Sequence, residues 1–230
     1  MPEVYIVKVD KRIDASLTSQ VTRHLSVEKQ SRIHRFRNYD DARRSLTSDL
    51  LVRSLVMNKL ALNNAEIIFG ENGYNKPFLE NNPQFEFNVS HSEDWVVCAV
   101  DRHPVGIDVE QMKPIDLGIA ERFFTADEYR KIMERKGTEQ LAYFYQLWTL
   151  KESYIKAIGK GLSIPLDSFS FQDEEAESMF TVQEGQNPRY FLTTTCLPSD
   201  YMLSVCAIDQ GPIQPVSIIE QDLYDFFLRL

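Results

Sequence analysis

Apolar residues recur at helical spacing in two long segments of the chain. In residues 40–60 the apolar side chains fall at i, i+4, i+5 and i+9, namely Leu46, Leu50, Leu51 and Leu55. Residues 138–158 carry apolar stripes over a similar length. Both segments therefore predict long helices whose apolar side is buried.

Two further segments predict shorter helical regions. Residues 16–36 are polar with intermittent apolar residues, which is typical of one or two surface helices. Residues 117–135 predict one more helix, in which Phe123 and Phe124 are the candidates for the core. None of these segments needs a disulfide or a structural metal, since a chain of this length buries a core of its own.

Alternation of apolar and polar residues predicts strands elsewhere. Residues 85–89 alternate as a half-buried strand does, and residues 95–100 form a continuous apolar run that favours a strand buried on both faces. The polar residues 90–94 predict a turn that joins the two into a hairpin, with His91 near its tip. Further strands are predicted near residues 1–9, 105–110, 169–171, 190–196 and 201–208.

The order of these segments repeats along the chain. A strand, helices and a hairpin in the first half resemble a strand, helices and strands in the second, and the halves meet near residues 101–104. The pattern predicts an α+β fold of two similar subdomains, residues 1–104 and residues 105–230.

Composition and charge narrow the class of protein. Hydrophobic residues make up 43% of the 230 residues and charged residues 26%, which is typical of a globular domain. The net charge of −9 argues against a protein whose main role is to coat nucleic acid or an anionic membrane. No apolar run approaches the roughly 18 residues of a spanning helix, and the N-terminus lacks a signal-peptide pattern. The three cysteines have apolar neighbours, so we expect reduced thiols in a cytoplasmic protein.

Two carboxylates fall on one face of the predicted strand at residues 106–110. Alternate residues of a strand share a face, so Ile107 and Val109 point into a core while Asp108 and Glu110 point the other way. Carboxylate oxygens are hard ligands that suit Mg²⁺. Taken alone, the same pattern also fits a solvated acidic face on an edge strand.

The predicted helix at residues 138–158 aligns an aromatic, an acidic and a basic residue. Trp148, Glu152 and Lys156 stand at i, i+4 and i+8 and so lie along one stripe. A carboxylate beside an ammonium in a cleft can hold a metal ion and a phosphate together. The alternative is an aromatic core contact next to a surface Glu–Lys pair.

Two other groups of residues could bind an anion. Ser90 and His91 near the hairpin tip can donate to phosphate oxygens, although a lone histidine is often structural. A basic stretch can clamp an anion or simply cover exposed helix faces; it consists of Lys29, Arg32, Arg35, Arg37, Arg43 and Arg44. No spacing suggests zinc, and no ordinary nucleotide-binding motif occurs.

These groups follow one another in a particular order. F-N-V-S-H-S at residues 87–92 is followed by G-I-D-V-E at 106–110, W-x-x-K-E-S-x-x-K at 148–156 and G-K-G-L at 159–162. The series resembles the Sfp-type 4′-phosphopantetheinyl transferases, whose hallmark is a G-[IV]-D-x-E segment followed by a W-x-x-K-E-[SA]-x-x-K helix. The resemblance covers almost the whole chain, including residues 41–54 near its start.

The resemblance implies a fold and a set of site residues. It implies a monomer of two similar α+β halves related by pseudo-twofold symmetry, with coenzyme A in an active site at their interface. The implied ligands of Mg²⁺, with Mn²⁺ as the alternative ion, are Asp108, Glu110 and Glu152. The implied phosphate contacts are Ser90, His91 and Lys156, and the implied catalytic residues are Glu152, Lys156 and His91.

The adenosine part of coenzyme A has its own implied contacts. The 3′-phosphate would be bound by Lys29, Arg32 and Arg44, and the adenine would lie along Lys76 and Pro77. One departure concerns the residue before that Lys-Pro pair, where the family often has glycine and this chain has Asn75. Asparagine tolerates positive φ better than most residues, so we expect the loop to keep its shape.

The implied reaction transfers 4′-phosphopantetheine from coenzyme A to a serine of an apo acyl or peptidyl carrier protein, which gives holo carrier and 3′,5′-ADP. The family favours nonribosomal peptide synthetases or related secondary-metabolite synthetases as partners. The base that takes the serine proton is left open among Glu152, a metal-bound water and Glu128. Candidate apolar contacts to the carrier follow the metal strand, at Met112, Ile115 and Leu117.

Two rival functions remain from other classes. One is a non-catalytic module that binds carrier proteins or coenzyme A, and the other is a Mg²⁺-dependent phosphohydrolase with the same carboxylates. Release of 3′,5′-ADP only in the presence of apo carrier would separate the transferase from both.

Overall fold

Two β-sheets form the centre of the protein. The computed structural model describes residues 1–10, 13–173, 179–182, 189–209 and 211–230. The first sheet has the order β11 (Pro215–Ile219), β1 (Glu3–Lys8), β5 (Trp95–Asp101) and β4 (Glu86–Ser92). The second has the order β6 (Gly106–Gln111), β10 (Tyr201–Ala207), β9 (Phe191–Leu197), β8 (Met179–Val182) and β7 (Phe171–Asp173).

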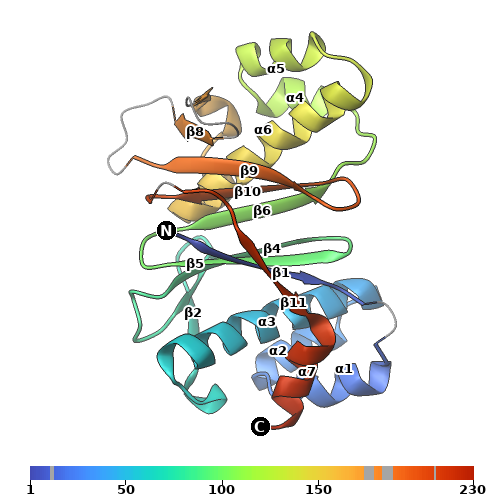
Figure 1. Cartoon of the computed structure of the whole chain (residues 1–230), viewed down its shortest axis with the longest axis vertical. Helices are drawn as coiled ribbons and strands as arrows, with labels where there is room; N and C mark the ends of the chain where they lie inside the picture. The colour runs from blue at the N-terminus through green and yellow to red at the C-terminus, as the bar shows by residue number, and fades with distance from the viewer. Residues whose placement is uncertain (11–12, 174–178, 183–188, 210) are drawn as a thin grey trace.

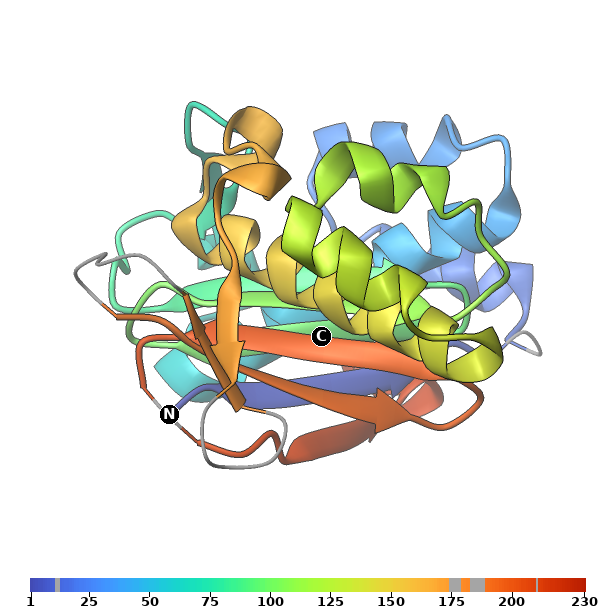
Figure 2. The same ribbon diagram turned by 90° about the horizontal axis from the view of Figure 1, so that it is seen from above.

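Helices cover the outer side of each sheet, as Figure 1 shows. The first sheet is covered by α1 (Ala15–Thr22), α2 (Val27–His34), α3 (Tyr39–Leu60) and α7 (Glu220–Leu228). The second is covered by α4 (Gly118–Phe123), α5 (Ala126–Met133) and α6 (Gly137–Ile158), which Figure 2 shows from above. A small hairpin of β2 (Phe69–Glu71) and β3 (Pro77–Leu79) stands apart from both sheets, and short 3₁₀ turns lie at Asn64–Glu66, Gly161–Ser163 and Leu166–Ser168. The expected α+β class is confirmed.

Side chains of β5 fill both of the cores that flank the first sheet. Val96, Cys98 and Val100 pack with the leucines of α3, whereas Val97 and Ala99 pack against the second sheet. The prediction of a strand buried on both faces is therefore confirmed, because alternate side chains of one apolar run serve two different cores. The two long helices are confirmed as well, at Tyr39–Leu60 and Gly137–Ile158.

The prediction of a single helix over residues 117–135 is wrong. The chain breaks between α4 and α5, where Thr125 caps α5 by accepting the backbone N–H of Glu128, and the Glu128 carboxylate accepts the N–H of Thr125 in return. This reciprocal capping box starts a new helix. The break turns Phe124 into the core, while Phe123 remains 43% exposed, so the expectation of a buried Phe123 is also wrong.

The last strand and helix join the first sheet. β11 pairs in parallel with β1, and Tyr224 and Phe227 of α7 pack in the core beside α3. Residues 215–228 thus lie with the first sheet, although they fall in the predicted segment 105–230. None of the helices within the described ranges is long and apolar enough to cross a membrane.

A buried ion pair anchors this returning segment. Arg43 and Glu220 are both about 1% exposed, and Nη2 of Arg43 lies 2.6 Å from Oε2 of Glu220. The Glu220 carboxylate also accepts the Thr47 hydroxyl at 2.7 Å and the Asp10 backbone N–H at 2.6 Å. Arg43 is therefore an internal structural residue, which removes it from the basic stretch proposed as an anion clamp.

Candidate active site

The edge strands of the two sheets, β4 and β6, lie side by side where the halves of the chain meet (Figure 1). Side chains of β4 accept the backbone N–H groups of β6. Ile107 N–H donates to Asn88 Oδ1 at 2.9 Å, Val109 N–H to Ser90 Oγ at 3.4 Å and Gln111 N–H to Ser92 Oγ at 3.1 Å. We call these three contacts the β4–β6 seam.

The two strand carboxylates face this seam. The Ser90 hydroxyl donates to Asp108 Oδ1 at 2.9 Å, and the Ser92 hydroxyl donates to Glu110 Oε2 at 3.0 Å. Because both carboxylates meet serines of β4, the expectation that they share one side of the strand agrees with their positions. Asp108 is only 3% exposed, so the seam holds a charged group inside the protein.

Lys156 of α6 completes a polar cluster with Asp108 and Ser90. Its Nζ lies 2.5 Å from Asp108 Oδ1, 3.1 Å from Ser90 Oγ and 3.4 Å from the carbonyl oxygen of Ile107. The other carboxylate oxygen of Asp108, Oδ2, is buried and has no hydrogen-bond partner among the residues that the structure describes. A buried charged oxygen without a partner is costly, so it marks a place where a further cation or donor fits.

The negative charge of Asp108 affects the pKa of Glu110 and of Glu152. Burial raises the pKa of Glu110 to about 7, and the charge of Asp108 acts in the same direction. Burial and then Asp108 also raise the pKa of Glu152 on α6. Because the charge of Asp108 raises the pKa of both glutamates, the carboxylates are close enough to repel, and a divalent cation is one means of relieving that repulsion.

The fit of a metal ion can be judged from these groups. Among the described residues, no three His, Cys, Asp or Glu side chains already stand in an arrangement that could hold a metal. The donor set nevertheless suits a hard cation, since it offers carboxylate oxygens and includes the unpartnered Oδ2 of Asp108. The residues present therefore fit Mg²⁺ or Mn²⁺ in chemistry.

A glycine lets α6 approach this strand closely. A Cβ at Gly106 would collide with the carbonyl oxygen of Ser153 and lie 2.5 Å from the Ala157 nitrogen. Trp148, one turn before Glu152 on α6, packs on Phe124 and Phe144. Its ring centroid lies 6.3 Å from that of Phe124 and 6.1 Å from that of Phe144. Close packing and the aromatic contacts fix the axial position of α6 and hence the placement of its polar side chains over β6.

The lysine next to Glu152 has a structural position. Lys151 is fully buried, and its Nζ donates to the carbonyl oxygens of Leu166 and Phe169, both at 2.7 Å. It also lies 2.9 Å from Oε2 of Glu128, which is itself 5% exposed. Glu128, one of the candidate bases, is therefore engaged with Lys151 and with the cap of α5.

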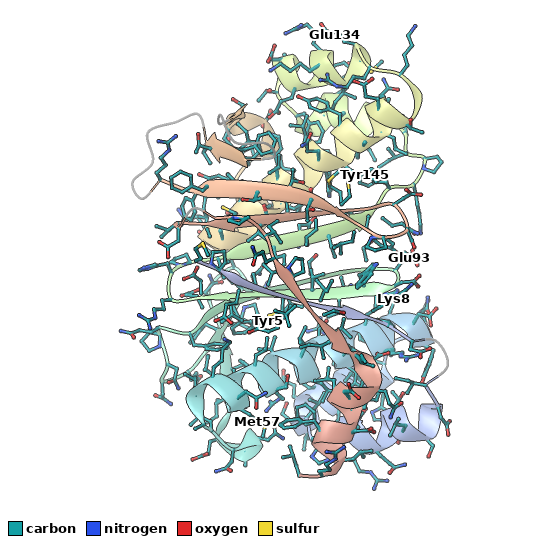
Figure 3. All side chains as sticks on the ribbon, in the orientation of Figure 1. Tyr5, Lys8, Met57, Glu93, Glu134 and Tyr145 are labelled. Carbon is teal, nitrogen blue, oxygen red and sulfur yellow. The ribbon has the colours of Figure 1, made fainter. Side chains whose placement is uncertain are left out.

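Glu93, labelled in Figure 3, lies in the turn between β4 and β5. His91 stands near the end of β4, two residues before Glu93. Arg44 donates to the Glu93 carbonyl oxygen at 2.9 Å and is bonded to Asp41. Desolvation, and then the charge of Arg44, lower the pKa of His91 below its ordinary value. The residue as a whole keeps contact with solvent while its imidazole is largely desolvated, so a neutral imidazole lies beside Arg44.

Lys29 and Arg32 belong to α2, which packs against α3. Lys29 pairs with Asp49 of α3 at 3.3 Å, and Arg32 is exposed in the last turn of α2. Arg44 is also expected at the 3′-phosphate, and its positive charge lowers the pKa of His91.

The loop with Lys76 and Pro77 connects β2 and β3. Asn75 has φ of 63°, as expected for a residue that takes the place of glycine there. The Lys76 ammonium donates to the carbonyl oxygen of Ala157 at 3.1 Å and lies 3.4 Å from that of Val105, while Pro77 is exposed. The lysine side chain thus bonds to the end of α6, and Pro77 is the exposed member of the Lys76-Pro77 pair.

The predicted carrier contacts are partly buried. Met112, Ile115 and Leu117 pack against the aromatic cluster of α5 and α6. In this position they support the core, and their role in docking stays a prediction. Phe123, 43% exposed beside Trp148, presents a large apolar surface in this region.

The sequence predicts no role for Asn88 and Ser92, which hold β6 at the site, or for Glu220, which anchors residues 215–228 to the first sheet. Asn88 and Ser92 stand two residues either side of Ser90, and this period of two could have indicated that all three face the same neighbour. The partners of Glu220 are far away in sequence, so no local pattern reveals them.

Comparisons with known proteins give a consistent result. The profile of the 4′-phosphopantetheinyl transferase superfamily matches residues 104–206, and the profile described as 4′-phosphopantetheinyl transferase, N-terminal, matches residues 14–103. The chain is 41% identical to 4′-phosphopantetheinyl transferase ffp of Bacillus subtilis over 206 residues, which cover 89% of this chain and 92% of the relative. It is 39% identical, with the same coverage, to 4′-phosphopantetheinyl transferase Sfp of Bacillus subtilis (strain 168). It is 42% identical to 4′-phosphopantetheinyl transferase gsp of Aneurinibacillus migulanus over 188 residues, 82% of this chain and 78% of the relative.

Proposed function

The chain belongs to the 4′-phosphopantetheinyl transferase superfamily, and from this membership we propose that it transfers 4′-phosphopantetheine from coenzyme A to a serine of an apo carrier protein. The observation that carries the proposal is the cluster of Lys156, Asp108 and Ser90 at the β4–β6 seam. It combines the Lys156 ammonium with a carboxylate oxygen that has no hydrogen-bond partner in the described part of the chain. Such a pair suits a phosphate and a cation together.

The serine oxygen of the carrier attacks the β-phosphorus of coenzyme A, and 3′,5′-ADP leaves with the electrons of the broken P–O bond. Lys156 donates to the phosphate oxygens as their negative charge grows, because its Nζ already lies among oxygen acceptors at the seam. His91 adds a neutral N–H donor at the rim, and a lowered pKa keeps it neutral at pH 7. Positioning and charge stabilisation together supply most of the rate.

Asp108, Glu110 and Glu152 are the residues that would hold Mg²⁺ or Mn²⁺. When bound, the cation neutralises charge on the two phosphates of coenzyme A. Of the candidate bases in the chain, Glu152 is favoured over Glu128, since Glu128 is engaged with Lys151. The raised pKa of Glu152 also brings its proton affinity closer to that needed near neutral pH.

We propose that the protein is a monomer of two subdomains related by pseudo-twofold symmetry. Coenzyme A would bind at their junction, and the second subdomain would carry the metal ligands. Support comes from the two sheets, which meet through their edge strands at the polar cluster. Its proposed partners are carrier domains of nonribosomal peptide or related synthetases in the cytoplasm. The exposed Phe123 and the neighbouring Met112, Ile115 and Leu117 form the proposed docking region.

Intact mass spectrometry of several apo carriers, after incubation with coenzyme A and Mg²⁺, tests the reaction. We expect each accepted carrier to gain the mass of one phosphopantetheine group, with release of 3′,5′-ADP only when apo carrier is present. Hydrolysis of coenzyme A without a carrier would favour the phosphohydrolase, and binding without any mass gain would favour the non-catalytic module.

Arg44→Ala is expected to weaken binding of coenzyme A by about 10-fold, because a charge-assisted hydrogen bond to the 3′-phosphate is lost. Binding of dephospho-coenzyme A should change little, since that ligand lacks the 3′-phosphate. Calorimetric titration of both ligands measures the difference. Arg37→Ala, which removes an exposed charge of the same stretch, is the matched control. Equal losses for both ligands would show that Arg44 acts only by holding Glu93 and Asp41.

A further inference from the structure

Ser92 has a bonding pattern that the proposed mechanism leaves unused. Its hydroxyl oxygen accepts the backbone N–H of Gln111 at 3.1 Å, and the hydroxyl lies 3.0 Å from Oε2 of Glu110. A backbone N–H can only donate, so it takes a lone pair of the hydroxyl. The hydroxyl proton is then free to point to the carboxylate, which only accepts when ionised.

The same pattern occurs one pair earlier along the two strands. Ser90 accepts the N–H of Val109 and donates to Asp108, and the residue offset between acceptor and N–H donor is the same for both serines. Asn88 continues the series with Ile107. Side chains of β4 thus accept the N–H groups of β6 that a neighbouring strand's backbone would otherwise accept. These bonds fix the position of β6, which carries both carboxylates, relative to β4.

We infer that Ser92 is a positioning residue that orients the Glu110 carboxylate for the divalent cation. This inference rests on the proposed role of Glu110 as a metal ligand. With Oε2 held by Ser92, rotation of the Glu110 carboxylate is restrained. Ser92 itself needs no contact with coenzyme A or with the carrier.

Binding of Mn²⁺ to the protein in the presence of coenzyme A, without carrier, tests this role by electron paramagnetic resonance. Ser92→Ala is expected to raise the dissociation constant of Mn²⁺ about 10-fold, a typical effect of removing a hydrogen bond to a metal-bound side chain. Ser92→Thr keeps the hydroxyl and should bind as wild type does. Ser217→Ala, on the exposed face of β11, is the control for a serine-to-alanine change on a strand.

A double-mutant cycle separates positioning through Glu110 from a general effect on the fold. If Ser92 acts through Glu110, then Ser92→Ala adds nothing to the loss caused by Glu110→Gln. Additive losses, or wild-type Mn²⁺ binding by Ser92→Ala while Glu110→Gln binds weakly, would overturn the inference and leave the proposed function intact. Unchanged Mn²⁺ binding by Glu110→Gln would instead remove Glu110 from the metal ligands, and the role of Ser92 with it.

Discussion

Asp108→Asn is expected to lower the rate of phosphopantetheine transfer about 1,000-fold or more, because charge stabilisation of a transferring phosphate contributes several kcal/mol. The substitution keeps the size of the side chain but removes the negative charge beside Lys156. It also alters the carboxylate whose buried Oδ2 has no hydrogen-bond partner within the described ranges. The measurement is the initial rate of holo-carrier formation at saturating coenzyme A and Mg²⁺.

Two controls make this result specific. Glu139→Gln removes a carboxylate that is 76% exposed at the start of α6, and it should leave the rate unchanged. Thermal unfolding of Asp108→Asn shows whether the protein still folds, since the variant leaves Lys156 without its ion-pair partner. A folded Asp108→Asn protein that transfers at the wild-type rate would contradict both the metal site and the role of the cluster.

Glu220→Ala is expected to lower the free energy of unfolding by about 3–5 kcal/mol, the range found when one partner of a buried ion pair is removed. The change leaves the guanidinium of Arg43 buried and removes the acceptor of Thr47 and of the Asp10 N–H. Urea unfolding, followed by circular dichroism, measures the loss.

Replacing both partners tests the cause of this loss. In the double variant Arg43→Met with Glu220→Leu, no charge is left unpaired, so we expect it to be more stable than Glu220→Ala. Glu134→Ala breaks an exposed ion pair with Arg130 on the surface of α5, and it should have little effect. A small loss of stability in Glu220→Ala would mean that water reaches Arg43 in the variant.

Local patterns were sufficient for the elements that carry the site. The spacing of apolar residues predicts α3 and α6 to within a residue or two, and the continuous run at residues 95–100 predicts a strand that serves two cores. The period of two places Asp108 and Glu110 on one side of β6, where both meet serines of β4. Asn75 adopts the positive φ that its residue type allows.

The start of α5 has a local sequence signal, but the helical spacing of apolar residues around it conceals that signal. Thr125 followed by Glu128 is a capping box, and it marks the start of α5 inside a segment whose apolar residues suggest one helix. The period of helical apolar residues continues across the break, which is why Phe123 and Phe124 both resemble core residues. Only the change of helix direction separates them.

The remaining features depend on contacts between distant parts of the chain. Arg43 and Glu220 are 177 residues apart, and nothing near Arg43 distinguishes it from its neighbour Arg44. Burial decides between them, since Arg43 is enclosed by the returning segment while Arg44 bonds to the hairpin turn. Lys151 is likewise buried because its ammonium donates to the carbonyl oxygens of Leu166 and Phe169, which follow it in the chain.

The position of β11 has a consequence for the order in which the protein can assemble during synthesis. β1 lies between β5 and β11, but β11 follows every other described strand in the chain. Until the ribosome has released residues 215–219, one edge of β1 carries unpaired N–H and C=O groups next to an apolar core. An open edge of this kind invites pairing with other chains. The emerging polypeptide therefore passes through a long interval in which its first sheet is prone to aggregate, and the arrival of β11 and α7 ends that interval.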